Sequence, residues 1–335
     1  DVGGTWYWNT YPGARCDVES YNYAYFFDKD IVRDWDWSDA CAGQEEIQRY
    51  LRFVAERCDV LNDISFDTKI VSAVLNEESG LWTVTTSHKE KIVCRYLVLA
   101  IGALSEPKTP DIDGVDTFSG DTYFTSNWPK DHTVDLTGKR VGIIGTGSSG
   151  VQAIPEIAKT ASEVHVFQRT ANYVTPTRSG PMDPDLVAKL RKDPHAVRQA
   201  SRETYGGHTP LDIGKERFLE LDKAGRERAL SEAWDGTYVP LAFRDAYLPE
   251  ANAAISDFIR EKMLEQVNDS WTANHLVPWD HPFGGKRPCM SNVYLQTYNL
   301  PHVHLVPLSE TPIEHITTDG IKTTEELIAL DVIVY

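Results

Sequence analysis

A glycine-rich loop between an apolar run and an amphipathic segment most constrains the fold of this chain. The loop has the pattern G-x-G-x-x-G at residues 145–150 and follows the apolar residues 140–144. Residues 150–160 have helical spacing, and residues 163–168 form a second apolar run. This order predicts a βαβ unit that binds a dinucleotide, with the pyrophosphate at the helix N-terminus. The alternative is an ordinary tight turn between a strand and a helix.

The end of the second predicted strand indicates which dinucleotide would bind. Sites for NAD usually carry Asp or Glu here, where the carboxylate binds the ribose 2′-hydroxyl. In this chain the strand ends in Gln168, Arg169 and Thr170, and Arg169 lies 19 positions after Gly150. A guanidinium group can bind a 2′-phosphate through forked, charge-assisted hydrogen bonds. The sequence therefore favours NADP(H) over NAD(H), although a surface ion pair would also account for Arg169.

Composition and charge exclude several classes of partner. The chain has 335 residues and a formal net charge of −17, which argues against nucleic acid or an anionic membrane as a partner. It has no apolar run of about 18 residues, so no membrane-spanning helix is expected. Five cysteines are scattered without a C-x-x-C motif, which predicts reduced thiols, a cytoplasmic protein and no zinc site. The histidines form no ligand-like pattern with acids or cysteines, so no metal is expected.

The pattern of apolar residues predicts an α/β chain. Before the glycine loop it predicts a helix at 44–58, then an antiparallel meander that continues into a buried strand, with strands at 64–75, 81–86 and 91–100. After the βαβ unit it predicts a polar, mostly helical stretch at 181–275. Further strands are predicted at 301–306, 313–316 and 327–335.

Four motifs follow one another along the chain. The first is D-V-G-G-T-W-Y-W-N-T-Y-P-G-A-R-C-D-V-E-S at 1–20, and the second is F-S-G-D-T-Y-F-T-S-N-W-P at 118–129. The third joins G-T-G-S-S-G-V-Q to the strand end V-F-Q-R-T, and the fourth is F-G-G-K-R-P at 283–288. Together they resemble the Baeyer–Villiger monooxygenases, above all the phenylacetone, cyclohexanone and steroid monooxygenases. The second motif is similar to the family signature F-x-G-x-x-x-H-x-x-x-W, with Phe124 at the histidine position.

The resemblance implies a fold, two cofactors and a reaction. It implies two dinucleotide-binding, Rossmann-like domains, one for FAD and one for NADP, with a helical insertion in the NADP domain. In the family, NADPH reduces FAD, and the reduced flavin reacts with O₂ to form a C4a-peroxyflavin. This species inserts one oxygen next to the carbonyl of a small ketone and gives an ester or a lactone. The alternatives are an N- or S-oxygenating flavin monooxygenase and an inactive nucleotide-binding fragment.

The resemblance also divides the chain into regions. We expect a partial FAD-binding domain at 1–105 and a linker with the signature motif at 106–138. An NADP-binding domain, with its helical insertion at about 181–275, is expected at 139–325, and a strand returning toward the FAD domain at 326–335. The family has a glycine fingerprint for FAD before the equivalent of Asp1 and further segments after the equivalent of Tyr335. We therefore expect the chain to be part of a longer protein.

Two charged residues have a catalytic role by this resemblance. Arg287 would be the fixed cation that stabilises the negatively charged oxygenating flavin, because arginine stays protonated and charge stabilisation is strong where water is excluded. Asp17 would hold this cation and partly neutralise it. Lys286 and Arg169 would bind the 2′-phosphate of NADP. Taken alone, a Lys-Arg pair is usually a solvated surface pair, and an aspartate is usually a turn or cap residue.

The remaining implied cofactor contacts form two groups. On the NADP side they are Gly145, Thr146, Gly147, Ser148, Ser149, Gly150, Gln152 and Thr170. On the FAD side they are Thr5, Trp6, Trp8, Asp17, Tyr23 and Ile70, with Arg15 and Cys16 as further cofactor contacts. The tryptophans alone would be read as core residues, and it is the joint order of the motifs that assigns them to a cofactor.

Overall fold

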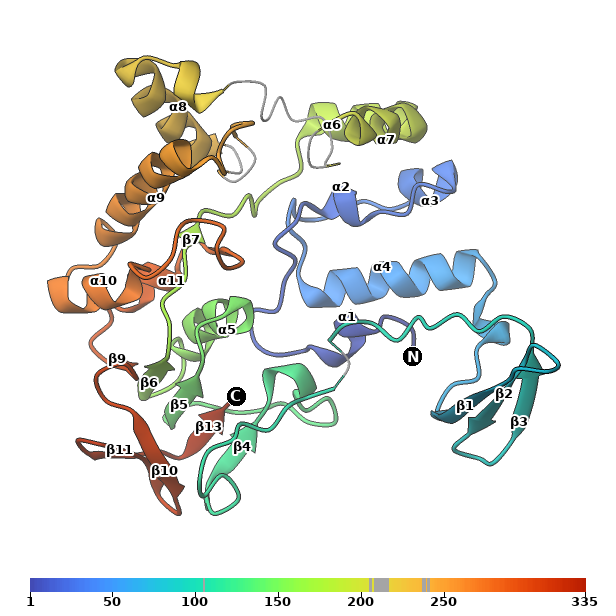
Figure 1. Ribbon diagram of the computed structural model, residues 1–335, viewed down its shortest axis with the longest axis horizontal. Helices are drawn as coiled ribbons and strands as arrows, with labels where there is room; N and C mark the ends of the chain where they lie inside the picture. The colour runs from blue at the N-terminus through green and yellow to red at the C-terminus, as the bar shows by residue number, and fades with distance from the viewer. Residues whose placement is uncertain (105, 205–206, 208–216, 237–238, 240–241) are drawn as a thin grey trace.

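The computed structural model describes residues 1–104, 106–204, 207, 217–236, 239 and 242–335. Figure 1 shows a three-stranded sheet, β1 to β3, at one side of the view and the helices α8, α9 and α10 at the other. The strands of a five-stranded sheet and helix α5 lie between them. Of the predicted site residues, those of the glycine loop and of the end of β6 belong to these central elements, whereas Ile70 lies on β1.

The predicted βαβ unit is present at the centre of the molecule. Strand β5 (Arg140–Ile144) leads through the glycine loop into α5 (Ser148–Ile157), and β6 (Glu163–Gln168) follows. The helix begins two residues earlier than predicted and ends before residue 160. The two strands pair in parallel, and their apolar side chains are buried beneath α5 because the crossover helix covers the sheet.

The five-stranded sheet has the strand order β4-β13-β5-β6-β9, and every neighbouring pair is parallel. Its remaining strands are β4 (Asp121–Tyr123), β9 (Val303–Pro307) and β13 (Val332–Val334). Strand β9 confirms the strand predicted at 301–306. The three residues of β13 are fully buried, as expected for a strand with neighbours on both sides.

Two segments outside the predicted region 139–325 contribute strands to this sheet. The segment 326–335 was expected to return toward the FAD domain, and its strand β13 pairs with β5 inside the sheet of the βαβ unit. The segment 106–138 was expected to be a linker, but its strand β4 pairs with β13 as the edge of the same sheet. A short strand gives no local signal of which sheet it will join, so neither pairing could be predicted from the sequence.

The predicted strand 327–335 is two strands. Strand β12 (Leu327–Ala329) closes an antiparallel sheet with β10 (Ile313–Thr317) and β11 (Gly320–Thr323). The chain then changes sheet at Leu330, whose N–H donates to the carbonyl of Asp319 at 2.9 Å. The next N–H, of Asp331, donates to the carbonyl of Arg140 at 2.9 Å. One apolar run can therefore contribute a strand to each of two sheets when the backbone turns between them.

The first part of the chain is built around α4 (Gln44–Arg57), which confirms the helix predicted at 44–58. Its buried face carries Ile47, Tyr50 and Val54 at helical spacing. The aromatic-rich segment before it forms short helices, α1 (Thr5–Trp8), α2 (Ser20–Tyr23) and α3 (Lys29–Arg33). The short helix η1 (Leu61–Asp63) follows α4.

The antiparallel meander is confirmed, but its first and last strands are shorter than predicted. It consists of β1 (Ile70–Asn76), β2 (Leu81–Thr86) and β3 (Lys91–Cys94), in the order β1-β2-β3. Residues 64–69 are outside β1. The predicted buried strand at the end of 91–100 is wrong, because Val98 and Leu99 are 84% and 70% exposed. Within the described residues, no strand pairs with this apolar segment.

The helical insertion predicted at about 181–275 is confirmed where the structure describes it; residues 205–206, 208–216, 237–238 and 240–241 lie outside the described part. Its helices are α6 (Pro184–Lys192), α7 (Pro194–Arg202), η3 (Phe218–Glu220), α8 (Lys223–Gly236), α9 (Pro249–Leu264) and α10 (Ser270–Leu276). The short elements η2 (Thr125–Asn127), β7 (Val174–Thr175), β8 (Cys289–Met290) and α11 (Tyr294–Thr297) complete the assignment. In the described part of the chain, no helix has the length and apolar character needed to cross a membrane.

An ion pair fixes β13 beside β5. The guanidinium of Arg140 donates from Nη2 to Oδ1 of Asp331 at 2.8 Å and from Nε to Oδ2 at 3.2 Å. The backbone N–H of Arg140 also donates to Oδ2 at 2.9 Å. These hydrogen bonds lower the pKa of the Asp331 carboxyl to about 2. The ionised carboxylate therefore stabilises the contact between the two strands.

We predict that Asp331→Asn lowers the free energy of unfolding by about 1 kcal/mol at pH 7, a value reduced for the solvent exposure of the pair. The folded pKa is below the unfolded value of about 3.9, so the contribution is complete above that value and is lost as the pH falls toward 2. Urea denaturation of both proteins at pH 7, 5 and 3.5 measures this. If the free energy of unfolding differs between the two proteins by the same amount at all three pH values, the ionised Asp331 carboxylate does not stabilise the strand contact.

Candidate functional site

The glycine loop has the geometry needed for close approach of a phosphate group. Gly145 has a φ of +112°, a region that favours glycine, and a Cβ added at Gly145 or Gly147 would have no atom within 4 Å. The loop surface is therefore open on the side where a ligand would approach. A Cβ at Gly150 would instead lie 2.3 Å from the carbonyl oxygen of Gly145. Only glycine allows α5 to begin so close to the end of β5.

The N-terminus of α5 has unpaired backbone donors. Its N-cap residue, Gly147, has no side chain that could accept from the first N–H groups. Thr146 donates its hydroxyl to the carbonyl of Thr170 at 3.1 Å, which ties the loop to the end of β6. Ser148 turns toward the thiol of Cys289, with 3.8 Å between oxygen and sulfur. The first turn of the helix therefore offers N–H groups to an anion.

A cavity of about 770 Å³ lies beside the glycine loop, at the carboxyl ends of β5 and β6. Three cations line it, namely the predicted Arg169 and Lys286 together with Lys108. Sequence reasoning missed Lys108, because a single lysine between two prolines gives no signal. Cations from three separate segments therefore surround one cavity next to a helix N-terminus, which is the arrangement expected around a phosphorylated ligand.

Arg287 and Asp17 are brought together from opposite ends of the chain. Nη2 of Arg287 donates a hydrogen bond to Oδ2 of Asp17, so the pairing implied by the sequence motifs is present. The arginine side chain is 69% exposed and the aspartate 16%. The carboxylate is therefore held within the protein while the guanidinium projects from it, and the ion pair leaves most of that cation accessible.

Asn172 is a second residue that sequence reasoning missed. Its Nδ2 donates to the carbonyl of Arg287 at 3.0 Å and to the sulfur of Cys289 at 3.4 Å. Its Oδ1 is buried and has no hydrogen-bond partner in the described part of the chain. Because Asn172 also lines the cavity, this amide joins the backbone of the Lys286–Arg287 segment to the cavity wall.

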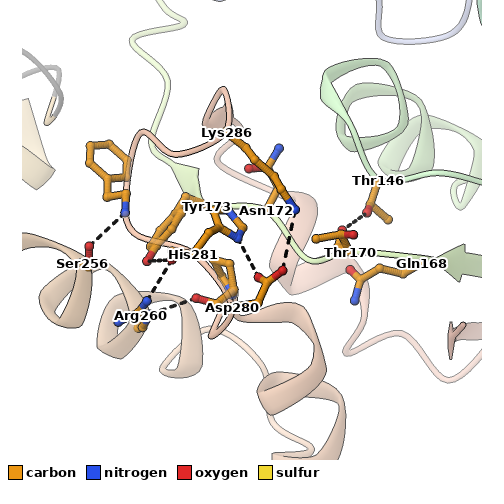
Figure 2. A network of polar contacts seen from close by, with 12 residues as sticks. Thr146, Gln168, Thr170, Asn172, Tyr173, Ser256, Arg260, Asp280, His281 and Lys286 are labelled. Carbon is orange, nitrogen blue, oxygen red and sulfur yellow. Dashed lines mark hydrogen bonds and ion pairs between the residues drawn. The ribbon is translucent and has the colours of Figure 1, made fainter. Parts of the chain in front are cut away.

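Helix α9 holds the loop that carries the two basic residues. Three polar side chains spaced four residues apart on this helix contact the loop 278–283. Asn252 donates to the carbonyl of Phe283 at 2.9 Å, and Ser256 accepts from its N–H at 3.0 Å. Arg260 donates to the carbonyls of Pro278 and His281 at 3.0 and 3.1 Å. Figure 2 shows Ser256 and Arg260 directed from the helix toward this loop.

The same loop provides a counter-ion for Lys286. Its Nζ lies 3.7 Å from Oδ2 of Asp280, and Nδ1 of His281 lies 2.6 Å from Oδ1 of the same carboxylate (Figure 2). The hydrogen bond with His281, more than the charge of Lys286, lowers the pKa of Asp280. Tyr173 donates its hydroxyl to the carbonyl of His281 at 3.1 Å. Lys286 is thus held at the cavity by a loop that is itself hydrogen-bonded to α9 and to Tyr173.

Gln152, predicted to contact NADP, is bonded to protein groups in this structure. Its Oε1 accepts from the Tyr11 hydroxyl at 2.8 Å and from the Arg15 N–H at 3.3 Å. Its Nε2 donates to the Arg15 carbonyl at 3.1 Å. Arg15 in turn donates to the hydroxyl of Ser179 at 2.7 Å. These bonds hold the segment that carries Asp17 against α5.

The residues predicted on the FAD side are only partly brought together. Trp6 donates its indole N–H to the hydroxyl of Tyr23 at 2.8 Å. Cys16 is buried, and burial raises the pKa of its thiol to about 12, so it is an unreactive thiol at neutral pH. Trp8 is half exposed, and Nζ of Lys130 lies 3.8 Å from the centroid of its ring. Thr5 is the first residue of α1, the short helix that ends at Trp8. Ile70 lies on the separate three-stranded sheet.

The described residues contain no group of three histidine, cysteine, aspartate or glutamate side chains that could hold a metal ion. All five cysteines are free in the structure.

Comparison with known proteins identifies the family. The model of the family described as pyridine nucleotide-disulphide oxidoreductase matches residues 26–200. The 2-oxo-Δ(3)-4,5,5-trimethylcyclopentenylacetyl-CoA monooxygenase of Pseudomonas putida is 41% identical over 100% of this chain and 63% of its own length. A phenazine N-monooxygenase of Lysobacter antibioticus is 40% identical over 97% of this chain and 60% of its own.

The structural comparison agrees. The structure of an oxidized steroid monooxygenase bound to NADP superposes with a TM-score of 0.93 and 44% identity, over 100% of this chain and 64% of that one. Further relatives that match the whole chain at 34–37% identity are named as Baeyer–Villiger or cycloalkanone monooxygenases. The chain spans about 60% of the length of these curated relatives.

The chain therefore belongs to the pyridine nucleotide-disulphide oxidoreductase family. The predicted α/β dinucleotide-binding fold is confirmed, and so is the predicted resemblance to the Baeyer–Villiger monooxygenases, which extends over the whole chain.

We predict that Arg260→Ala lowers the free energy of unfolding by about 2–3 kcal/mol, because it leaves the carbonyls of Pro278 and His281 without their charged donor. Arg260→Lys should recover only part of this, since an ammonium group cannot reproduce the forked geometry. Lys262→Ala, on the same helix, removes a solvent-exposed ion pair with Glu265 and should change stability by less than about 0.5 kcal/mol. Chemical denaturation of the three variants tests this, and an Arg260→Ala protein as stable as Lys262→Ala would contradict it.

Proposed function

We propose that the protein containing this chain is an NADPH- and FAD-dependent Baeyer–Villiger monooxygenase that inserts one atom of O₂ next to the carbonyl of a small ketone. The observation that carries the proposal is the Arg287–Asp17 ion pair, in which Arg287 directly follows Lys286, a residue that lines the cavity at the glycine loop. Whole-chain similarity to enzymes named for ketone oxygenation supports it. A cytoplasmic location remains a prediction.

The cavity fits NADP(H). The open glycine loop and the uncapped start of α5 would hold the pyrophosphate. Arg169 at the end of β6 and Lys286 on the loop held by α9 would bind the 2′-phosphate, with Lys108 as a third cation. Asp280 would keep Lys286 directed toward the cavity. The absence of an acidic residue at the end of β6 favours NADP(H) over NAD(H).

FAD would supply the redox chemistry and the activation of O₂. On this chain we assign contact with FAD to Trp6, Tyr23 and Asp17; Trp6 and Tyr23 are hydrogen-bonded to each other, and Arg287 donates a hydrogen bond to the Asp17 carboxylate. Arg287 would place a permanent positive charge where negative charge develops on oxygen. Asp17 holds that guanidinium in one position, and Asn172 holds the backbone of Arg287.

Oxygenation at nitrogen or sulfur is the alternative, and one relative is named a phenazine N-monooxygenase. It is not favoured, because several relatives that match the whole chain are named for ketones or for Baeyer–Villiger oxidation. Product analysis with a cyclic ketone, a thioether and a heteroaromatic amine distinguishes ketone oxygenation from oxygenation at sulfur or nitrogen. A protein that forms only N- or S-oxides would contradict the proposal.

We predict that Arg169→Ala and Lys286→Ala each raise the dissociation constant for NADP⁺ by about 10- to 100-fold, because each removes a charge-assisted contact to the 2′-phosphate. Binding of NAD⁺, which lacks this phosphate, should change by less than about 2-fold in both variants. The control is Lys159→Ala, which removes an exposed lysine paired with Glu156 outside the cavity. Titrations followed by fluorescence need no catalytic turnover. If a variant changes the dissociation constants for NADP⁺ and NAD⁺ by the same factor, its residue does not bind the 2′-phosphate.

We predict that Arg287→Ala lowers kcat for ketone oxygenation by about 10²- to 10³-fold, because the developing negative charge loses its fixed cation. FAD content, measured from the flavin absorbance of the purified protein, should be retained. An Arg287→Ala protein with full activity would exclude this residue from the mechanism.

A further inference from the structure

Helix α1 carries three of the predicted FAD contacts, Thr5, Trp6 and Trp8, yet none of its four residues is buried. Its N-cap residue is Gly4, which has no side chain that could cap the helix. One contact that holds it comes from Gln44, whose Nε2 donates a hydrogen bond to the carbonyl of Trp6. A helix of one turn is not stable by itself, so its position depends on a few side-chain contacts of this kind.

Lys130 makes a second contact with α1, on the rings of Tyr7 and Trp8. Its Nζ lies 3.7 Å from the centroid of the Tyr7 ring and 3.8 Å from that of Trp8. The two rings meet edge to face, with centroids 5.0 Å apart. A cation is attracted to an aromatic ring within about 6 Å of its centroid, and both distances are well inside this limit. We call this contact of one ammonium group with two rings the Lys130 clamp.

The two rings take the place of an acidic partner for Lys130. The chain has 50 acidic residues and 33 lysines and arginines, yet Lys130 forms no ion pair in the described part of the chain. The adjacent carboxylate, that of Asp131, lies 2.8 Å from Nδ1 of His132 instead. Partial removal of the ammonium group from water lowers the pKa of Lys130. The position of this ammonium group is therefore explained by the rings and not by an ion pair.

Lys130 reaches α1 from the sheet that carries the glycine loop. It follows Trp128 and Pro129 at the end of the signature motif. Trp128 is buried in the core formed with β5 and α5, and its ring packs on that of Tyr123 in β4, with centroids 5.2 Å apart. Pro129 restricts the backbone between this buried ring and Lys130. The clamp therefore connects the dinucleotide-binding sheet to a helix on the predicted FAD side.

We propose that Lys130 is a positioning residue for FAD, because its ammonium group holds the rings of Tyr7 and Trp8, and with them α1, in the orientation to which FAD binds. The proposal rests on the proposed function, since contact between α1 and FAD is part of that function. A cofactor that binds only the held helix binds more tightly when the clamp keeps the helix in place. This gain in affinity is limited to the free energy of the two cation–π contacts.

The test is the affinity of the apoprotein for FAD, measured by titration of the flavin fluorescence without turnover. Lys130→Met keeps an unbranched side chain but removes the charge. It should raise the dissociation constant for FAD by about 5- to 30-fold, the range expected from two exposed cation–π contacts. Lys130→Arg should stay within about 2-fold of the unmodified protein, because a guanidinium group also binds aromatic faces. The matched control is Lys192→Met, which changes an exposed lysine at the end of α6 and should have no effect.

Two further measurements distinguish this role from a general loss of structure. The dissociation constant for NADP⁺ should change by less than about 2-fold in Lys130→Met, because Lys130 does not line the cavity at the glycine loop. In a Tyr7→Leu background, Lys130→Met should weaken FAD binding by only about 2- to 5-fold, because one of the two rings is already absent. Tyr7 suits this experiment because it is not one of the predicted FAD contacts.

Three results would overturn the proposal while the proposed function stands. One is an unchanged affinity for FAD in Lys130→Met. Another is an equal loss in Lys130→Met and Lys130→Arg, which would assign the effect to packing and not to charge. The third is an undiminished effect of Lys130→Met in the Tyr7→Leu background, which would show that Lys130 does not act through the rings. An unmodified protein that binds no FAD would contradict the proposed function and this proposal together.

Discussion

The close approach of α5 to the end of β5 is the constraint on which the candidate site depends. It exists because Gly150 has no Cβ and can lie against the carbonyl of Gly145. This contact places the N-terminus of α5 at the carboxyl edge of a parallel sheet, where the ends of β5, β6 and β9 converge. Ligands bind at this edge in open α/β sheets, because helix N-termini and the following loops meet there. The cavity beside the loop lies at this edge.

The charges at this edge come from segments far apart in the chain. Arg169 follows β6 directly, so its position depends only on the sheet. Lys286 and Arg287 instead depend on α9, whose Asn252, Ser256 and Arg260 contact the preceding loop. The helical insertion therefore has a structural role in the site, because α9 holds the loop that leads into this basic segment. Asp17 then fixes Arg287 from the first segment of the chain, which Gln152 holds to α5.

Much of this arrangement could be predicted from residue patterns. The glycine spacing identified the βαβ unit, and the apolar spacing of 44–58 identified α4, because both are local and periodic signals. Sheet membership could not be predicted in this way: β4 lies in the segment expected to be a linker and β13 in the segment expected to return toward the FAD domain, and both pair within one sheet. The exposed segment after β3 was expected to be a buried strand because its composition is apolar, but composition alone does not show whether a strand pairs with it. Lys108 and Asn172 were missed because single polar residues carry no pattern.

The sequence by itself determined the glycine loop, the helix that follows it and the arginine at the end of β6, since these depend on residue types at short spacing. The family resemblance paired Arg287 with Asp17, but the contact itself depends on the fold. Only the tertiary structure decided that Gln152 bonds to Arg15 and that Asp280 holds Lys286. The physical reason is that such contacts depend on how distant segments pack, and each residue's local neighbours are compatible with several partners. Parallel strand pairing and side-chain packing select one of them only when the whole core forms.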